Sequence, residues 1–166
     1  MNPFRKEKTL RPQRADSMRY VIQKMVEKDL DEVVTIAASS TSNPWSMNMF
    51  IKEMSNPLSY CFIVKTKGDS KYPLMGFICF RNIEDESELF NICVHPQYRQ
   101  LGIGKKLMQF YIGLCNKNKI KTFYLEVDSS NQVAIHLYRL FAYQLMGIRK
   151  KFYQGKFDAL LMIRKD

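Results

Sequence analysis

The sequence predicts one mixed α/β (α+β) domain with an antiparallel first half and helical crossovers in its second half. Its apolar patterns follow the order strand, two helices, three strands, helix, strand, helix and two strands. A length of 166 residues with 46% hydrophobic residues is enough for one buried core, and no internal repeat is present. At residues 89–107 a strand runs through a glycine loop directly into an amphipathic helix.

The first half begins with residues 1–17, which are polar and basic and are expected to form a flexible tail ahead of a domain at 18–166. Asp29 is expected to cap a helix whose apolar residues follow helical spacing up to Ala37. Ser46 is expected to cap a second, short helix. Strands are expected at residues 19–26, 60–65, 74–82 and 88–94, with turns at 67–70 and 83–87.

The second half alternates helices with strands and ends in a hairpin. The helix after Gly102 is expected to end within residues 116–119, and a strand follows at 122–127. Ser129, Ser130 and Asn131 supply a cap for a helix that continues through Phe141. Two final strands, at 144–153 and 157–164, are joined by a turn for which Gly155 is suited.

The junction at residues 89–107 has the features of an anion-binding site. Exposed backbone N–H groups and the positive end of the helix dipole meet where the helix begins. Gly102 and Gly104 allow the backbone to approach an anion without interference from a Cβ atom. This arrangement predicts phosphate binding without specifying the ligand.

Charge and cysteine content restrict the class of protein. The net charge of +10 favours nucleic acid, a ribonucleoprotein or a phosphorylated cofactor as partner, and a merely solvated basic surface is the alternative. With only two histidines and no CxxC pair, no metal site is expected. We expect neither a membrane span nor a secretory signal, and a cytoplasmic location. The cysteines, all in apolar segments, are expected to be buried free thiols: Cys61, Cys79, Cys93 and Cys115.

Several spaced motifs resemble one known family when taken in order along the chain. They are Pro44-Trp45-Ser46, Glu88-Leu89-Phe90-Asn91-Ile92, Val94-x-Pro96-x-Tyr98-Arg99, Arg99-x-x-Gly102-x-Gly104, Leu125-Glu126-Val127-x-x-Ser130-Asn131, Ala134-Ile135-x-Leu137-Tyr138 and Arg149-Lys150-x-Phe152-Tyr153. From about residue 19 to residue 163 the chain resembles the GNAT N-acetyltransferases, and among them the RimI-type ribosomal-protein-alanine N-acetyltransferases. The resemblance implies a GNAT-like fold, with a central mixed, mostly antiparallel sheet and helices on both faces.

The chain departs from the family at Ala142-Tyr143, where Gly-Phe is usual. Because alanine lacks the easy left-handed conformation of glycine at a helix end, a different local turn is expected there.

The resemblance implies acetyl-CoA as co-substrate and no metal. Backbone amides of the glycine loop would wrap the pyrophosphate, with charge added by Arg99 and the lysines after the loop. The strand before the loop would pair with pantetheine and polarise the thioester carbonyl. The implied cofactor-binding residues are Ile92, Cys93, Val94, Arg99, Gln100, Leu101, Gly102, Ile103, Gly104, Lys105, Asn131 and Tyr138. For Asn131, capping its helix, contacting the cofactor or both remain open.

Glu126 and Tyr138 are the candidate catalytic residues. In an alternating strand, Glu126 points away from the face that carries Leu125 and Val127. The resemblance assigns Glu126 the role of general base, acting through water, and Tyr138 the role of general acid for the leaving thiolate. The structural alternatives are an ordinary exposed or ion-paired strand glutamate for Glu126 and a core aromatic residue for Tyr138.

The resemblance points to a protein N-terminus as acceptor, in particular the N-terminal alanine of a small-subunit ribosomal protein. Trp45 and Tyr153 are amphipathic aromatics suited to gripping a peptide, with core or surface packing as the alternative, and Glu88 and Asn91 are expected to help. An α-amine has a pKa of about 7.7–8, against about 10.4 for lysine, so it is partly neutral at pH 7. No residue is placed as an acyl-accepting nucleophile, so direct transfer is expected.

Two other functions stay open from the sequence. One is a GNAT that acetylates lysine side chains or small amines such as polyamines, against which the charge of +10 argues mildly. The other is a non-catalytic acetyl-CoA-sensing or RNA-binding module, although Glu126 and Tyr138 are both present. We expect a monomer or weak dimer, no membrane partner and no requirement for direct nucleic-acid binding.

Overall fold

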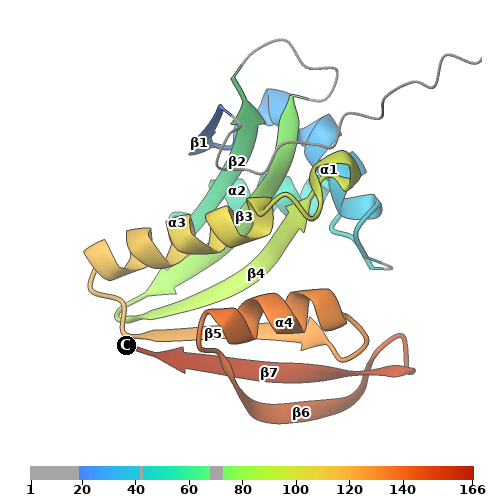
Figure 1. The fold of residues 1–166 in the computed structure, drawn as a ribbon, viewed down its shortest axis with the longest axis vertical. Helices are drawn as coiled ribbons and strands as arrows, with labels where there is room; N and C mark the ends of the chain where they lie inside the picture. The colour runs from blue at the N-terminus through green and yellow to red at the C-terminus, as the bar shows by residue number, and fades with distance from the viewer. Residues whose placement is uncertain (1–18, 42, 68–72) are drawn as a thin grey trace, which may run out of the picture.

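A computed structural model describes residues 19–41, 43–67 and 73–166. They form a seven-stranded sheet in the order β1-β2-β3-β4-β5-β7-β6 (Figure 1). All neighbouring strands are antiparallel except β4 and β5, which are parallel. The predicted mixed, mostly antiparallel sheet is confirmed. The expected tail at residues 1–17 and most of the expected turn at 67–70 lie outside the described residues.

Every predicted helix and strand is present among the described residues, and the strand ends shift by one or two residues at most. Two 3₁₀ turns, Glu27–Asp29 and Pro96–Tyr98, precede the first helix and the glycine loop. None of the helices in the described part of the chain has the length and apolarity needed to cross a membrane. The bounds are β1 Tyr20–Lys24, α1 Leu30–Ala38, α2 Met47–Ser55, β2 Ser59–Thr66, β3 Leu74–Ile83, β4 Glu86–Val94, α3 Ile103–Lys117, β5 Thr122–Asp128, α4 Gln132–Leu140, β6 Gln144–Tyr153 and β7 Phe157–Lys165.

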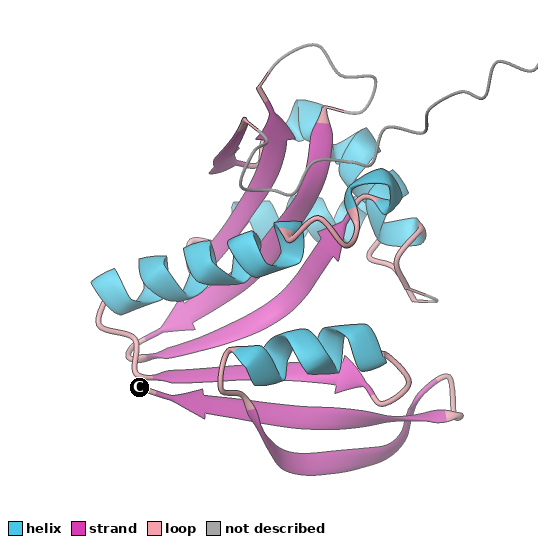
Figure 2. Cartoon of the chain, viewed as in Figure 1, coloured by secondary structure: helices cyan, strands magenta, loops and turns pink. Residues whose placement is uncertain are grey.

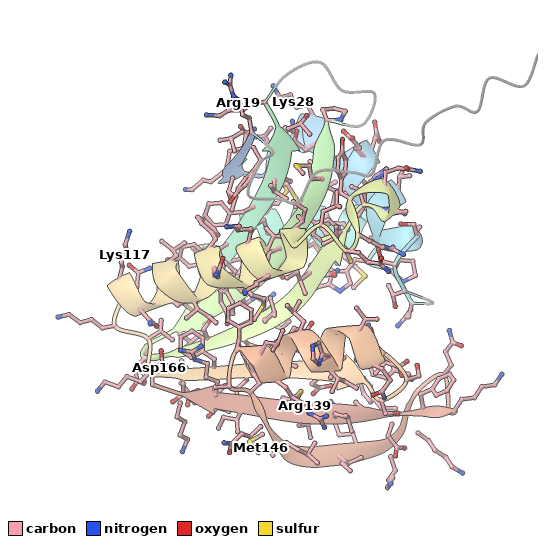
Figure 3. All side chains as sticks on the ribbon, in the orientation of Figure 1. Arg19, Lys28, Lys117, Arg139, Met146 and Asp166 are labelled. Carbon is pink, nitrogen blue, oxygen red and sulfur yellow. The ribbon has the colours of Figure 1, made fainter. Side chains whose placement is uncertain are left out.

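The four helices cover both faces of the sheet, as predicted (Figure 2). One core cluster joins α1 and α2 to one face and includes Phe50 and Phe77. The other joins α3 and α4 to the opposite face and includes Ile78 and Leu107, so neighbouring β3 residues enter different cores. Burying each such side chain contributes about 1.5–3 kcal/mol, which makes this two-sided packing the main source of stability. Charged side chains such as that of Lys117 point outward (Figure 3).

Asp29, Ser46 and Asn131 all occupy the predicted N-cap positions, but only two of the three make a capping hydrogen bond. Ser46 accepts a hydrogen bond from the Met49 N–H, and Asn131 accepts one from the Ala134 N–H, so both predicted caps are confirmed. Asp29 is the N-cap residue of α1, as predicted, but its side chain makes no capping hydrogen bond with that helix. Its carboxylate instead accepts the Val26 N–H at 3.0 Å and pairs with Lys65 Nζ at 2.7 Å. Because Asp29 is only 3% exposed, its charge requires such a partner.

Ala142 takes the left-handed conformation that was not expected of it. The φ of Ala142 is +62°. The N–H of Ala142 donates to the carbonyl of Arg139 at 3.0 Å, and the N–H of Tyr143 donates to the carbonyl of Tyr138 at 3.2 Å. These two bonds form a Schellman turn, which usually has glycine in this place. The expected change of turn is therefore wrong. The alanine keeps the turn at a backbone cost of about 1–2 kcal/mol.

The substitution Ala142→Gly is expected to raise the free energy of unfolding by about 0.5–1 kcal/mol. Glycine removes the strain of positive φ, and the greater freedom of the unfolded chain offsets part of that gain. The same substitution inside α4, Ala134→Gly, is the matched control and is expected to lower the free energy by about 1 kcal/mol. Urea denaturation measures both changes. A lower midpoint for Ala142→Gly would contradict the strain argument.

Candidate active site

The parallel pair β4 and β5 separates part-way along its length. The two strands pair only from Glu86 to Leu89 on β4, opposite Thr122 to Leu125 on β5. The β3–β4 register shows why: Cys79 lies opposite Asn91 and Phe80 opposite Leu89, which leaves Phe90 as an extra, bulged residue. A bulge bends its strand and increases its twist, so β4 turns away from β5 (Figure 1). Beyond Leu89, β4 has no strand partner on this side among the described residues.

A cavity of about 280 Å³ lies where the two strands diverge. Its walls come from the loop between α1 and α2, from the first turn of α2, from β4 and β5, from α4 and from the end of β6. Residues far apart in the sequence meet here. The predicted site residues that line the cavity are Trp45, Asn91, Ile92, Cys93, Glu126, Asn131, Tyr138 and Tyr153.

The other predicted cofactor residues surround the start of α3 and do not line this cavity. Gly102 is the N-cap residue of α3 and has a φ of +89°, a conformation that favours glycine. The side chains of Leu101 and Ile103 are buried in the core, so only their main chain can face a ligand. A Cβ at Gly104 would lie 3.4 Å from Leu137 Cδ2, which is ordinary contact. Val94, Gln100 and Lys105 complete this group.

Arg99 is engaged by protein atoms. Its Nε donates to the carbonyl of Val94 at 3.2 Å, and its Nη2 donates to the carbonyl of Ser39 at 3.0 Å and to Ser40 Oγ at 3.1 Å. The guanidinium thus ties the end of β4 to the C-terminal end of α1, where a positive charge is favourable. In this arrangement Arg99 acts first as a structural link.

Glu126 occupies the face of β5 that alternation predicts. Leu125 and Val127 are buried against α3 and α4, whereas the Glu126 side chain is 27% exposed on the opposite face. Both its carboxylate oxygens accept from Arg149 Nη1, at 2.9 and 3.2 Å. Arg149 also lies over the Phe152 ring, 3.9 Å from its centroid. The glutamate is therefore an ion-paired residue that also forms part of the cavity wall.

Tyr138 belongs to the hydrophobic core and to the cavity at once. It is 6% exposed and packs 6.0 Å, ring centre to ring centre, from Tyr143. Burial raises the pKa of the Tyr138 phenol well above its usual range, and the nearby thiol of Cys93 contributes in the same direction. The phenol therefore keeps its proton at neutral pH and can act as a hydrogen-bond or proton donor.

Glu88 lies outside the cavity lining, next in sequence to Leu89, which does line the cavity. Burial raises the pKa of its carboxyl, the charge of Glu126 raises it further, and Arg81 opposes both effects. The two carboxylates are thus close enough to affect one another. This proximity places Glu88 beside the candidate base without placing it in the cavity.

Sequence reasoning missed two cavity residues of consequence. Phe90 lies in the motif Glu88-Leu89-Phe90-Asn91-Ile92, but its exposure to the cavity depends on the bulge, which no sequence pattern there predicts. Asp128 could have been found, because it shares the polar face of β5 with Glu126. Its Oδ1 accepts from the Ser130 N–H at 2.8 Å and from Ser130 Oγ at 2.7 Å, which holds the turn before α4.

The fold is that of an acetyltransferase family. The chain matches the model of the Acetyltransferase (GNAT) family over residues 29–143, which is more than half of its length. It therefore belongs to the GNAT family, and it is an acetyl-CoA-dependent N-acetyltransferase. Both the predicted fold and the resemblance to RimI-type enzymes are confirmed.

Individual relatives agree with this assignment. The chain is 33% identical over 144 residues to the putative ribosomal protein bS18-alanine N-acetyltransferase of Bacillus subtilis, covering 85% of this chain and 92% of the relative. It is 29% identical to the ribosomal protein bS18-alanine N-acetyltransferase of Escherichia coli K12, covering 85% and 94%. The crystal structure of the ribosomal-protein-S18-alanine N-acetyltransferase from Escherichia coli matches with a TM-score of 0.78 at 28% identity, covering 88% and 93%.

Cys93 is expected to be unreactive although it lines the cavity. Burial raises the pKa of its thiol to about 11, and only the thiolate is a strong nucleophile. At pH 7.5 iodoacetamide should alkylate Cys93 roughly a hundredfold more slowly than in the urea-unfolded chain, where the thiol pKa is about 8.5. Mass spectrometry of the Cys93 peptide measures both rates. Equal rates in folded and unfolded protein would contradict this prediction and reopen a covalent route.

Proposed function

We propose that this chain transfers an acetyl group from acetyl-CoA to the α-amine of a protein N-terminus, and that the acceptor is the N-terminal alanine of a small-subunit ribosomal protein. The observation that carries the proposal is a single cavity with Glu126, Tyr138 and the free edge of β4 in its walls. The names of the Bacillus subtilis and Escherichia coli relatives, at about 30% identity, support the choice of acceptor.

The residues present fit acetyl-CoA. The edge of β4 from Ile92 to Val94 offers main-chain groups with no strand partner on the β5 side in the described chain, and an extended chain of amides can pair with such an edge. The first N–H groups of α3, beside Gly102, suit a pyrophosphate, and Lys105 is exposed and can add charge. When bound, acetyl-CoA supplies an acetyl group already activated as a thioester.

Glu126 would act as general base and Tyr138 as general acid. A carboxylate oxygen of Glu126 accepts a proton from the incoming amine through a water molecule, because the side chain reaches the cavity from a solvent-accessible face. The Tyr138 hydroxyl, kept protonated by its burial, donates a proton to the departing sulfur. Cys93 keeps its proton, so direct transfer needs no covalent intermediate on this chain.

The acceptor side of the cavity is built from aromatic and amide groups. Trp45, Phe90 and Tyr153 come from three different segments of the chain, and Asn91 lies among them. Burial raises the pKa of the Tyr153 hydroxyl, which stays a donor near neutral pH. Flat aromatic walls with a few hydrogen-bonding groups suit a short peptide end that carries a small first side chain.

A peptide array tests the proposed acceptor. Purified protein with acetyl-CoA is expected to add one acetyl group to peptides that begin with alanine, and none when the same α-amine is blocked and an internal lysine is left free. Mass spectrometry measures the transfer and locates the acetyl group. Transfer to lysine or to polyamines, with no transfer to any free N-terminus, would contradict the proposal. It would favour an acetyltransferase that acts on lysine side chains or small amines.

Substitution of the two proposed catalytic residues tests the mechanism. Glu126→Gln and Tyr138→Phe are each expected to lower kcat about 10²- to 10⁴-fold. The deficit of Glu126→Gln should shrink as the pH rises above about 8, because the α-amine then loses its proton unaided, whereas that of Tyr138→Phe should not.

Tyr124→Phe is the matched control for the tyrosine. Tyr124 lies on the same face of β5 as Glu126, outside the cavity lining, and donates a hydrogen bond to Glu86 Oε1 at 3.1 Å. It should keep wild-type activity. Full acetylation by the Glu126→Gln, Tyr138→Phe double variant would show that the catalytic assignment is wrong.

A further inference from the structure

We propose that the Glu53–Arg81 ion pair is a positioning element of the acceptor site, which fixes the aromatic wall formed by Phe90 and Trp45. This inference rests on the proposed function, because that wall belongs to the acceptor side of the same cavity. Glu53 and Arg81 do not line the cavity themselves, so their effect must pass through the rings.

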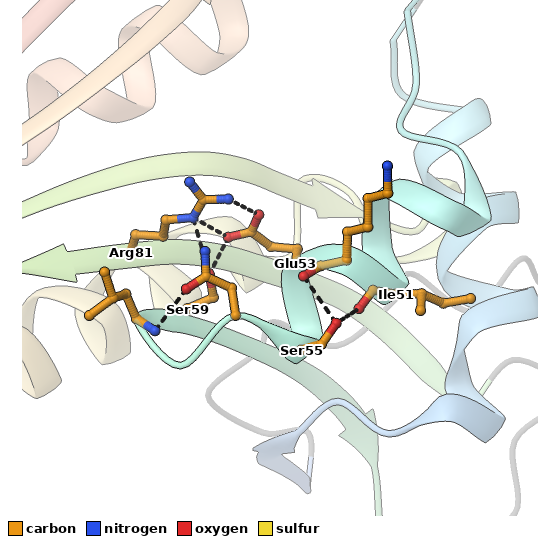
Figure 4. Close-up of polar contacts among 8 residues, drawn as sticks. Ile51, Glu53, Ser55, Ser59 and Arg81 are labelled. Atoms are coloured by element: carbon orange, nitrogen blue, oxygen red, sulfur yellow. Dashed lines mark hydrogen bonds and ion pairs between the residues drawn. The ribbon is translucent and has the colours of Figure 1, made fainter.

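The ion pair joins α2 to two strands with well-defined geometry (Figure 4). Arg81 on β3 donates from Nε to Glu53 Oε1 at 2.8 Å and from Nη2 to Glu53 Oε2 at 2.6 Å. Ser59 on β2 accepts from the same Nε at 3.2 Å and donates its hydroxyl hydrogen to Glu53. Two parallel bonds of this kind fix the plane of the guanidinium as well as its position.

The guanidinium then contacts the cavity wall. Arg81 Cζ lies 4.8 Å from the centre of the Phe90 ring, within the range of a cation–π contact. Phe90 lies 6.4 Å from Trp45, ring centre to ring centre, and Trp45 lies 5.2 Å from Phe50. Phe50 and Glu53 are one turn apart on α2, so the contacts form a closed ring from Arg81 back to Glu53.

Phe90 needs support of this kind more than its neighbours do. As the bulged residue of β4, it has no opposite residue on β3 to fix its direction. Trp45 lies in the loop before α2, outside any helix or strand. Both rings therefore depend on side-chain contacts for their placement. Arg81, which contacts Phe90, is itself held by Glu53 and Ser59 on the interior strand β3.

The stability of the fold alone does not explain why an ion pair occupies this position. Glu53 is 5% exposed, and burying a charge costs about as much free energy as its partner returns. An apolar pair would hold α2 on the sheet as well. Arginine offers in addition a flat cation that binds a carboxylate on its edge and an aromatic ring on its face, which lysine cannot do. The substitution Arg81→Lys separates the two roles, because it keeps the charge and removes the flat surface.

A second ion pair with a buried carboxylate provides the matched control. Asp29 and Lys65 lie 2.7 Å apart, and the side chain of Asp29 is 2% exposed. Lys65 is on β2, and β3 separates it from β4, whereas Arg81 is directly opposite Glu88 of β4. Lys65→Met therefore breaks a comparable ion pair away from the aromatic wall.

The experiment compares Arg81→Lys, the Glu53→Met, Arg81→Met double variant and Lys65→Met with the wild type. For the first two, the KM for an alanine-start peptide is expected to rise roughly threefold to tenfold, while the KM for acetyl-CoA stays within about twofold. Trp45 is the single tryptophan of the chain, so its fluorescence reports on the wall directly. Its emission should change in the Arg81 variants and stay as in the wild type in Lys65→Met.

The outcomes distinguish this inference from the proposed function. An active wild type together with an Arg81→Lys variant of unchanged peptide KM and unchanged Trp45 emission would overturn the inference alone. An equal rise of peptide KM in Lys65→Met would also overturn it, because the effect would then follow from lost stability. A wild type that acetylates no N-terminal peptide would overturn the proposed function and this inference with it.

Discussion

The separation of β4 from β5 is the constraint on which the rest of the site depends. Main-chain N–H and C=O groups must find hydrogen-bond partners, and β4 loses its neighbouring strand beyond Leu89. The bulge at Phe90 causes this separation and so leaves an edge that a ligand or water can complete. Had β4 continued beside β5, the two strands would have closed the space in which the cavity lies. The free edge of β4 is thus a property of strand pairing, with little dependence on the side chains along it.

Each wall of the cavity is held by a different layer of the fold. Tyr138 is anchored in the core between the sheet and the helices α3 and α4, whereas Trp45 packs on the opposite core with Phe50. Glu126 comes from the sheet itself. Groups mounted on separate packed layers keep their mutual geometry without any direct contact between them. For Tyr138, packing in the core and donating a proton are compatible roles, because the burial that packs the ring also keeps its hydroxyl protonated.

Local features of the chain were predictable from sequence, and features that depend on tertiary contacts were not. Strand alternation placed Glu126 on the correct face, and cap residues marked the starts of α2 and α4. The capping hydrogen bond expected of Asp29 is absent for a physical reason. Its carboxylate pairs with Lys65, which is 36 residues away, and no local sequence pattern predicts that ion pair. The Glu53–Arg81 pair, 28 residues apart, and the bulge at Phe90 escaped for the same reason. The order of β6 and β7 depends on sheet assembly and has no local signal either.

The proton affinity of the acceptor amine bears on which amines this site can use. The candidate base, Glu126, is ion-paired, and both its carboxylate oxygens accept from Arg149 Nη1. An α-ammonium with a pKa of about 7.9 loses its proton more easily than a lysine ammonium at about 10.4, a difference of about 3.4 kcal/mol at neutral pH. An α-amine therefore reaches its neutral, nucleophilic form at a smaller cost in free energy than a lysine side chain does, whichever group removes the proton. The proton affinity of the amine, independent of the shape of the cavity, thus supports the proposed protein N-terminus over a lysine side chain as the acceptor.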